Sequence, residues 1–255
     1  MTTTSASTPT TRSPAATFTA AVRAEAHKLG TLPAIWLLLV GTIALTVGLS
    51  LLFAANSGGA ELAGLELDIA VTAIPWTQCG FFLLGVVAAT SEYIGGQIRT
   101  TLVAMPNRVM QRVAALAALT ILALIAGLIT VSCSIVTMFI AANIDRATID
   151  PSTLIRVVVN ASVYLTLMSA LSSALGFLVR KAIPTAAILL VYLLIVSPLL
   201  QGQSWYWLPD MASYTLWFPT TPADAPDAPI AWLTIIAWTL AFLVPSIIIG
   251  KRRDT

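Results

Sequence analysis

The side chains that could carry out chemistry are few in this sequence and lie far apart. His27 is the single histidine among 255 residues, and the two cysteines, Cys79 and Cys133, both fall within apolar runs. A metal site or a nucleophile–base pair needs several such groups together. No cluster with that spacing occurs, so we expect no catalytic residue and no metal site. We interpret the two cysteines as apolar thiols rather than as a disulfide pair.

The sequence also lacks a phosphate-binding loop. Gly250-Lys251 is its only Gly-Lys pair, and Arg252 follows where such a loop needs Ser or Thr. We therefore expect this chain to hold no ATP or Mg and no other cofactor. Ion-coupled carriers usually keep ionisable groups inside the bilayer, and the apolar runs described next contain none. If the chain moves a solute, its energy must come from outside the membrane.

Six long apolar runs dominate the chain. Hydrophobic residues make up 58% of it and charged residues only 9%, against about 25% charged in a soluble domain. A helix crosses a bilayer with roughly 20 apolar residues, whereas barrel strands are short and alternating. The predicted fold class is an all-α integral membrane protein, with a disordered tail at 1–15 and one six-span domain at 16–255. The predicted transmembrane helices cover about 33–54, 69–90, 113–142, 157–179, 182–200 and 230–250.

Basic residues are distributed unevenly between the two sides that these spans define. If the N-terminus is cytoplasmic, eleven of the thirteen Lys and Arg residues lie inside, and only Arg146 and Arg156 lie outside. This bias is the positive-inside pattern. It predicts a multi-pass membrane protein with both termini in the cytoplasm. Asp210 falls in the long outer segment 201–229, whose aromatic half we expect to form short helices.

The segment before the first span looks helical and amphipathic. Phe18, Val22 and Leu29 can share one face, while other side chains in the segment supply charge. We predict a helix over 16–29 that lies along the inner membrane surface. The alternative is an ordinary solvated lead-in. The residues assigned to this interfacial helix are Arg23, Glu25 and Lys28.

One inner loop, 91–112, is long enough to have a structure of its own. Gly95 and Gly96 favour a bend, and Ile98, Leu102 and Met105 form one apolar face at helical spacing. The next residue, a proline, disfavours helix at the position before it. We therefore predict a short surface helix on which a cytoplasmic partner can push. The alternative is a passive basic loop.

The same loop resembles the cytoplasmic segment between the second and third spans of ABC-2 type permeases, the membrane subunits of ATP-driven exporters. The residues that carry the resemblance are Glu92-Tyr93, Gly95-Gly96-Gln97-Ile98-Arg99-Thr100-Thr101-Leu102, Pro106 and Arg108. The lead-in Arg23-Ala24-Glu25-Ala26-His27-Lys28-Leu29 is similar to the entry of bacterial members. That family often has a single Gly followed by Thr where this chain has Gly95-Gly96-Gln97.

The resemblance implies a dimer, with a second copy or a related permease, on separate ATPase subunits that bind ATP and Mg. It implies that the loop is a coupling helix, and that 16–29 is an interfacial helix in contact with membrane lipid. It implies no nucleic acid partner. The residues that this assigns to coupling with the ATPase are Glu92, Gly95, Gly96, Arg99, Thr100, Pro106 and Arg108.

Candidates for a substrate pathway are polar groups within the spans. Gln78 is the one side-chain amide well inside a span, and Phe81 and Phe82 lie near it. These three could line a route, or Gln78 could form an interhelical hydrogen bond. A stripe of small polar residues in the fourth span indicates helix packing or substrate contact. Two other classes stay open: a non-transporting scaffold or sensor subunit, and a membrane enzyme, which the missing catalytic groups disfavour.

Overall fold

The computed structural model describes residues 14–56, 66–93, 108–142, 149–201, 203–218 and 220–252. All regular secondary structure in this part of the chain is helical, without strands. In chain order it contains α1 (Pro14–Thr31), α2 (Pro33–Asn56), α3 (Glu66–Val71), α4 (Ile74–Thr90), η1 (Ser91–Tyr93), α6 (Arg108–Ala141), α7 (Pro151–Val179), α8 (Ala182–Val191), η3 (Tyr192–Val196), α9 (Ser197–Leu200), α10 (Pro209–Trp217) and α11 (Ala228–Arg252).

Six helical segments are long and apolar enough to cross a membrane, which confirms the predicted all-α, six-span class. They are Pro33–Asn56, Leu67–Thr90, Val109–Ala141, Pro151–Val179, Ala182–Leu200 and Ala228–Ile249. The third and fourth begin earlier than predicted, because charged residues do not end a helix that satisfies them. The Arg112 guanidinium donates to the Ser246 carbonyl and lies 5.4 Å from the Phe177 ring centroid. Asp150 caps α7 by accepting a hydrogen bond from the Thr153 amide.

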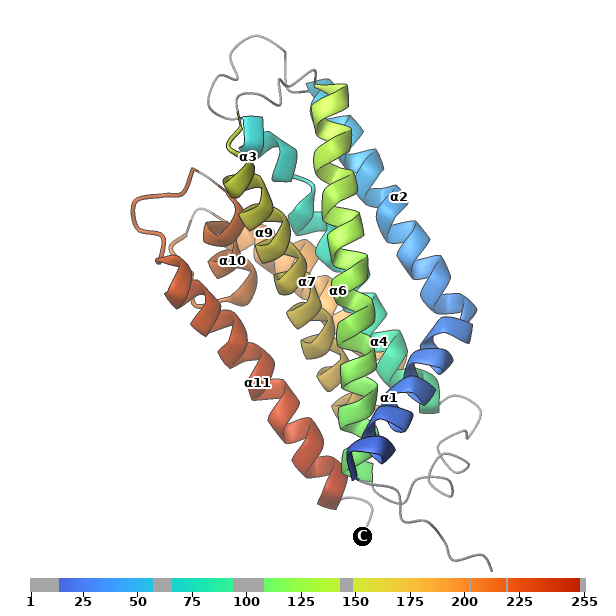
Figure 1. Cartoon of the computed structure of the whole chain (residues 1–255). Coiled ribbons are helices and arrows are strands. Elements are labelled where there is room, and N and C mark those ends of the chain that lie inside the picture. Colours follow the sequence, from blue (N-terminus) through green and yellow to red (C-terminus); the bar gives the residue numbers. More distant parts are fainter. Residues whose placement is uncertain are drawn as a thin grey trace, which may run out of the picture.

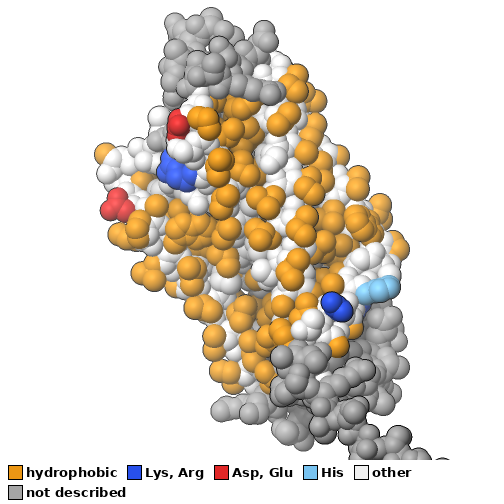
Figure 2. Space-filling view, in the orientation of Figure 1, with side chains coloured by type: hydrophobic (Ala, Val, Ile, Leu, Met, Phe, Trp, Pro, Cys, Tyr) orange, Lys and Arg blue, Asp and Glu red, His pale blue; other side chains and the backbone are white. Residues whose placement is uncertain are grey.

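Helix α7 is the centre of the bundle. It packs against α4, α6, α8, α10 and α11, while α2 packs on α4 and α6 at the other side. Most of its inward positions are fully buried. Helices α2 and α11 and the α8–α9 segment lie outside and carry exposed apolar side chains, such as Ile183 at 84% exposure. Figure 2 shows that hydrophobic side chains cover the middle of one face, with charged side chains toward its ends. Such a surface suits contact with lipid.

The first and last helices and the short helix α10 lie at opposite ends of the bundle. Helix α1, the start of α6 and the C-terminal end of α11 lie together at what we call the α1 end (Figure 1). Helices α3 and α10 lie at the other end, the α10 end (Figure 1). The first and last described helices are therefore on one side, as an even number of spans requires.

Small residues let the central helices approach closely. A Cβ added to Gly85 on α4 would lie 2.1 Å from the Ser169 carbonyl oxygen on α7. Gly127 on α6 faces Ser162 of α7, and Gly176 of α7 faces Ala89 of α4. The small-residue stripe of the fourth span is thus buried between helices, which supports the packing interpretation.

Two spans depart from regular α-helix near the α10 end, where the short helix α10 also lies. The second span breaks at Thr72–Ala73, between α3 and α4, and Pro75 opens the new helix. The fifth span contains the π-turn η3, where the Ser197 amide donates to the Tyr192 carbonyl. Pro198 follows and cannot donate a backbone hydrogen bond, which favours this distortion. Helix α10 enters the bundle and ends within nine residues, which confirms the predicted short helix in this segment.

Candidate functional site

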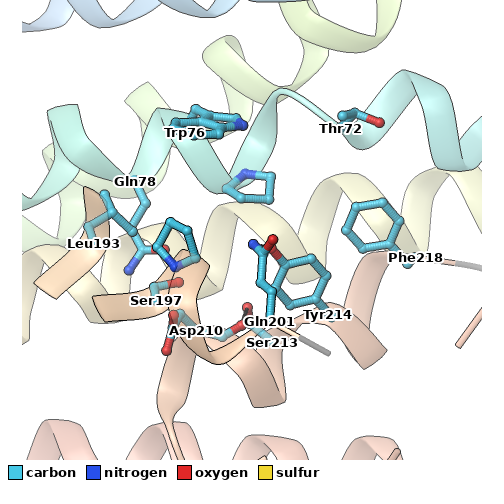
Figure 3. A pocket seen from close by; sticks show the side chains of 12 residues that line it. Thr72, Trp76, Gln78, Leu193, Ser197, Gln201, Asp210, Ser213, Tyr214 and Phe218 are labelled. Carbon is cyan, nitrogen blue, oxygen red and sulfur yellow. Dashed lines mark hydrogen bonds between the residues drawn. The ribbon is translucent and has the colours of Figure 1, made fainter. Parts of the chain in front are cut away.

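The candidate site is a cavity of about 190 Å³ at the α10 end, where these two spans and α10 meet. The break between α3 and α4 contributes Thr72, Pro75 and Trp76, and the first turns of α4 contribute Gln78. The fifth span contributes residues of η3 and α9, and α10 contributes Asp210, Ser213 and Tyr214. Figure 3 shows the side chains of Gln78, Ser197 and Asp210 on one side of the cavity, and those of Tyr214 and Phe218 on the other.

Gln78 lies at the bottom of this cavity and is 1% exposed. Its Oε1 accepts a hydrogen bond of 2.9 Å from the Tyr164 hydroxyl on α7. Its Nε2 has no hydrogen-bond partner among the described residues. Gln78 therefore combines the two roles that the sequence left open, because one end of its amide joins two helices and the other lines a cavity.

The other two pathway candidates do not line this cavity. Phe81 is buried in the hydrophobic core. Phe82 lines a separate, apolar cavity between α4, α7 and α11, together with Met168, Trp238 and Phe242. Of the three sequence candidates, the structure brings only Gln78 to the polar cavity.

Asp210 is the residue that sequence reasoning missed. It was counted among the acids of an outer loop, but the structure buries it to 3% exposure in the first turn of α10. The Tyr192 hydroxyl of η3 donates to its Oδ1, while its Oδ2 has no partner in the described part of the chain. Asp210 lies outside the six apolar runs, in the segment 201–229, and the structure shows that an acid of this segment is buried within the bundle. A signal was present in Leu208-Pro209-Asp210, which places an acid in the first turn of a short apolar helix.

Two aromatic side chains, Tyr214 and Phe218, form one wall of the cavity. The rings of Tyr214 and Phe218 stack with their centroids 5.2 Å apart. The side-chain amide of Gln201 donates a hydrogen bond of 2.9 Å to the Tyr214 hydroxyl. Beneath this wall, the Trp217 ring packs on Tyr164 at 4.9 Å.

The first span also carries buried hydroxyl groups, on Thr46 and Ser50, and these serve helix packing. The Thr46 hydroxyl lies 2.9 Å from that of Thr77 on α4, and the Ser50 hydroxyl lies 3.0 Å from that of Ser134 on α6. These pairs satisfy buried hydroxyls between neighbouring helices. They therefore hold α2 to the bundle and do not contribute to the cavity.

Most residues assigned to the coupling loop lie outside the described part of the chain. These are Gly95, Gly96, Arg99, Thr100 and Pro106. Glu92 lies in η1, directly after α4, and Arg108 is the first residue of α6, but their side chains are not described. Tyr93, also in η1, lies 6.0 Å below the Arg180 guanidinium of the α7–α8 turn, measured to its ring centroid.

The lead-in forms α1, which starts slightly earlier than predicted. Its buried face differs from the expected one, because Ala21, Glu25 and Leu29 are buried and Phe18 is exposed. Glu25 is only 4% exposed and forms an ion pair of 3.2 Å with Lys28. Arg23 is exposed. A carboxylate that pairs with a basic residue one turn away can be buried. The charge of Glu25 was therefore not enough to place it on the exposed face of α1.

Within the described ranges no three His, Cys, Asp or Glu residues could share a metal ion. A comparison with models of known protein families finds no match for this chain, and a comparison with curated proteins finds none either. Its six apolar helices and its exposed apolar surface indicate a multi-pass helical membrane protein.

Proposed function

We propose that this chain is the membrane-spanning subunit of an ATP-driven exporter, of the kind that ABC-2 type permeases represent. The observation that carries the proposal is the polar cavity inside a six-span bundle, with buried atoms of Gln78 and Asp210 that lack partners. A protein that handles a solute needs such a site within its membrane region. A scaffold or sensor subunit does not need one.

The energy for export would come from a partner. The sequence contains no phosphate-binding loop, so ATP and Mg would bind to a separate ATPase subunit. The proposed coupling segment, 91–108, connects the end of α4 to the start of α6, and the start of α6 lies at the α1 end together with the C-terminal end of α11 (Figure 1). We assign this end to the cytoplasm of a bacterial cell, in agreement with the eleven-to-two charge bias of the sequence.

Helix α1 would lie at the inner membrane surface. It packs on α6, and its buried side chains are Ala21, Glu25 and Leu29, while Arg23 and His27 are exposed. An amphipathic helix of this kind, with basic residues on its outer side, can bind lipid headgroups. The complete exporter would contain two six-span subunits, identical or related, and two ATPase subunits.

The test co-expresses the chain with an ABC-type ATPase, for which a neighbouring reading frame with a phosphate-binding loop would be the first candidate. The isolated chain should hydrolyse no ATP, whereas the co-expressed complex should co-purify and hydrolyse ATP in lipid nanodiscs. Arg99→Ala should weaken co-purification. Gly95→Ala with Gly96→Ala should lower ATP hydrolysis without loss of membrane insertion, because two such changes favour a continuous helix by up to about 2 kcal/mol.

A matched control is Gly48→Ala on α2, where an added Cβ meets no atom within 4 Å. This control should behave as the wild type. ATP hydrolysis by the isolated, uncontaminated chain would contradict the proposal. A stable complex whose ATP hydrolysis ignores all the loop variants would favour the scaffold.

A further inference from the structure

The cavity at the α10 end contains two buried polar atoms with opposite hydrogen-bonding needs. Asp210 Oδ2 is an acceptor and Gln78 Nε2 is a donor, and neither has a partner in the described part of the chain. Their residues are 3% and 1% exposed. An unmet hydrogen bond on a buried group is costly, and more so for a charged group. A ligand that satisfies both atoms would recover that cost.

The partner bonds of these residues fix which atoms are left for a ligand. The Tyr192 hydroxyl occupies Asp210 Oδ1, and the Tyr164 hydroxyl occupies Gln78 Oε1. Oδ2 and Nε2 therefore remain for a ligand, and both residues line the same cavity (Figure 3). Because the Tyr192 hydroxyl donates, Asp210 acts as an acceptor on both oxygens when it is ionised.

The charge of the cavity favours a cation. Asp210 is the one ionisable acid among its described lining residues, and no Lys, Arg or His accompanies it there. The first turn of α10 stabilises a carboxylate at this position but leaves Oδ2 without a hydrogen bond. Trp76, Tyr214 and Phe218 add aromatic rings to the wall, and aromatic faces attract ammonium groups.

Irregular backbone surrounds these groups on three sides. The helix break at Thr72–Ala73, the π-turn η3 and the start of α10 all border the cavity. Broken membrane helices are tolerated where they are buried in protein or line a cavity, and π-turns recur at functional sites. Two spans thus depart from α-helix at the same place, beside the first turn of α10.

We propose that this cavity binds a protonated amine that carries a hydroxyl or carbonyl oxygen a short distance from its nitrogen. The ammonium group donates to Asp210 Oδ2, and the oxygen accepts from Gln78 Nε2. A primary ammonium fits better than a quaternary one, because only the former has N–H groups to donate. The amine can come from a free solute or from an ethanolamine lipid headgroup. This inference does not depend on ATP-driven export, since binding is measured on the chain alone.

The test uses the purified full chain in detergent without ethanolamine lipids. Ethanolamine is the probe, and its thermal stabilisation of the protein gives an apparent Kd. Ethylene glycol lacks the charge and ethylamine lacks the acceptor oxygen, so both should bind more weakly. In a second arm, nanodiscs with phosphatidylethanolamine are compared with nanodiscs of phosphatidylcholine, whose headgroup has no N–H.

Variants locate the binding. Asp210→Asn should weaken ethanolamine binding about tenfold or more, as expected for loss of a hydrogen bond to a charged group. Gln78→Leu should remove the advantage of ethanolamine over ethylamine. Asp227→Asn, which removes an exposed carboxylate near the start of α11 outside the cavity, should bind as the wild type.

The two arms separate the sources of the amine. Stabilisation by free ethanolamine that Asp210→Asn abolishes supports a solute site. Stabilisation only by phosphatidylethanolamine, with the same loss, supports a headgroup site. Equal effects of ethanolamine and ethylene glycol, no effect in either arm, or full binding by Asp210→Asn would each overturn the proposal. The wild-type comparison of probes keeps the test valid if a variant does not fold.

Discussion

The close contact between α4 and α7 makes Gly85→Ala a severe substitution. The added Cβ would lie 2.1 Å from the Ser169 carbonyl oxygen and 2.1 Å from the Ser172 hydroxyl oxygen. The Ser172 side chain can rotate, but the backbone carbonyl cannot. To relieve the clash, the two helices must move apart at this point. The distance from the new Cβ to the carbonyl oxygen must grow from 2.1 Å to the 3.4 Å of ordinary contact, a shift of about 1.3 Å.

The size of the effect follows from this shift. Overpacking of a core costs about 1–3 kcal/mol, and a backbone clash at the centre of the bundle should reach the upper part of that range. Alanine favours helix over glycine by about 1 kcal/mol, which offsets part of this cost and leaves about 2 kcal/mol. Each kcal/mol corresponds to roughly 2–4 °C in the unfolding midpoint for a chain of this size, so we expect a fall of about 4–8 °C.

The assay is the midpoint of heat-induced loss of the folded peak in size-exclusion chromatography of detergent-purified protein. Gly127→Ala on α6 is the graded comparison, because its Cβ would lie 3.2 Å from Ser162 and needs only a small adjustment. Gly48→Ala on α2 meets nothing within 4 Å and should be neutral or slightly stabilising. If Gly85→Ala were as stable as Gly48→Ala, the close packing of α4 on α7 would be refuted.

Two further outcomes are expected in the same assay. Hydrogen bonds from the Ser152 hydroxyl and the Thr153 amide lower the pKa of Asp150 in the folded protein. The stability that Asp150 contributes is therefore complete above the ordinary aspartate pKa, near 4. This stability is lost as pH falls through the lower pKa of the folded state. Asp150→Asn should match the wild type at neutral pH and lose less stability on acidification to about pH 3; an identical acid loss would contradict this role. Asn160→Ala removes the 3.0 Å hydrogen bond to the Leu216 carbonyl, which joins α7 to α10. The loss of about 1 kcal/mol of folding stability should lower the midpoint by a few degrees. An unchanged midpoint would show that this hydrogen bond does not anchor α10.

The six spans could be predicted because each apolar run was long enough and free of charge. The rule of ending a span at a charged residue was less successful. Arg112 lies within α6 because the Ser246 carbonyl and the Phe177 ring receive its guanidinium. Such partners come from distant parts of the chain, which a local pattern does not contain.

The candidate site was predicted only in part, for the same reason. Gln78 was identifiable as a lone amide within an apolar run. Asp210 was not, because its burial depends on α10 folding back into the bundle and on the Tyr192 hydroxyl of another span. Glu25 was assigned to the interfacial helix as one of its charged residues, and the structure shows that it is buried and paired with Lys28. Hydropathy describes how much of a segment avoids water, and it says little about which polar groups find partners.

The turn between α7 and α8 has a consequence for how the chain enters the bilayer during synthesis. It consists of Arg180 and Lys181 alone, and Arg180 takes the left-handed conformation, with φ of 59°, that turns the chain back after α7. Placing a basic residue in the middle of a membrane helix costs about 2.5–3.5 kcal/mol. This short turn leaves no room to place one span in the bilayer while the other waits in water. The fourth and fifth spans should therefore be inserted together, as one helical hairpin whose basic tip stays on the side of synthesis.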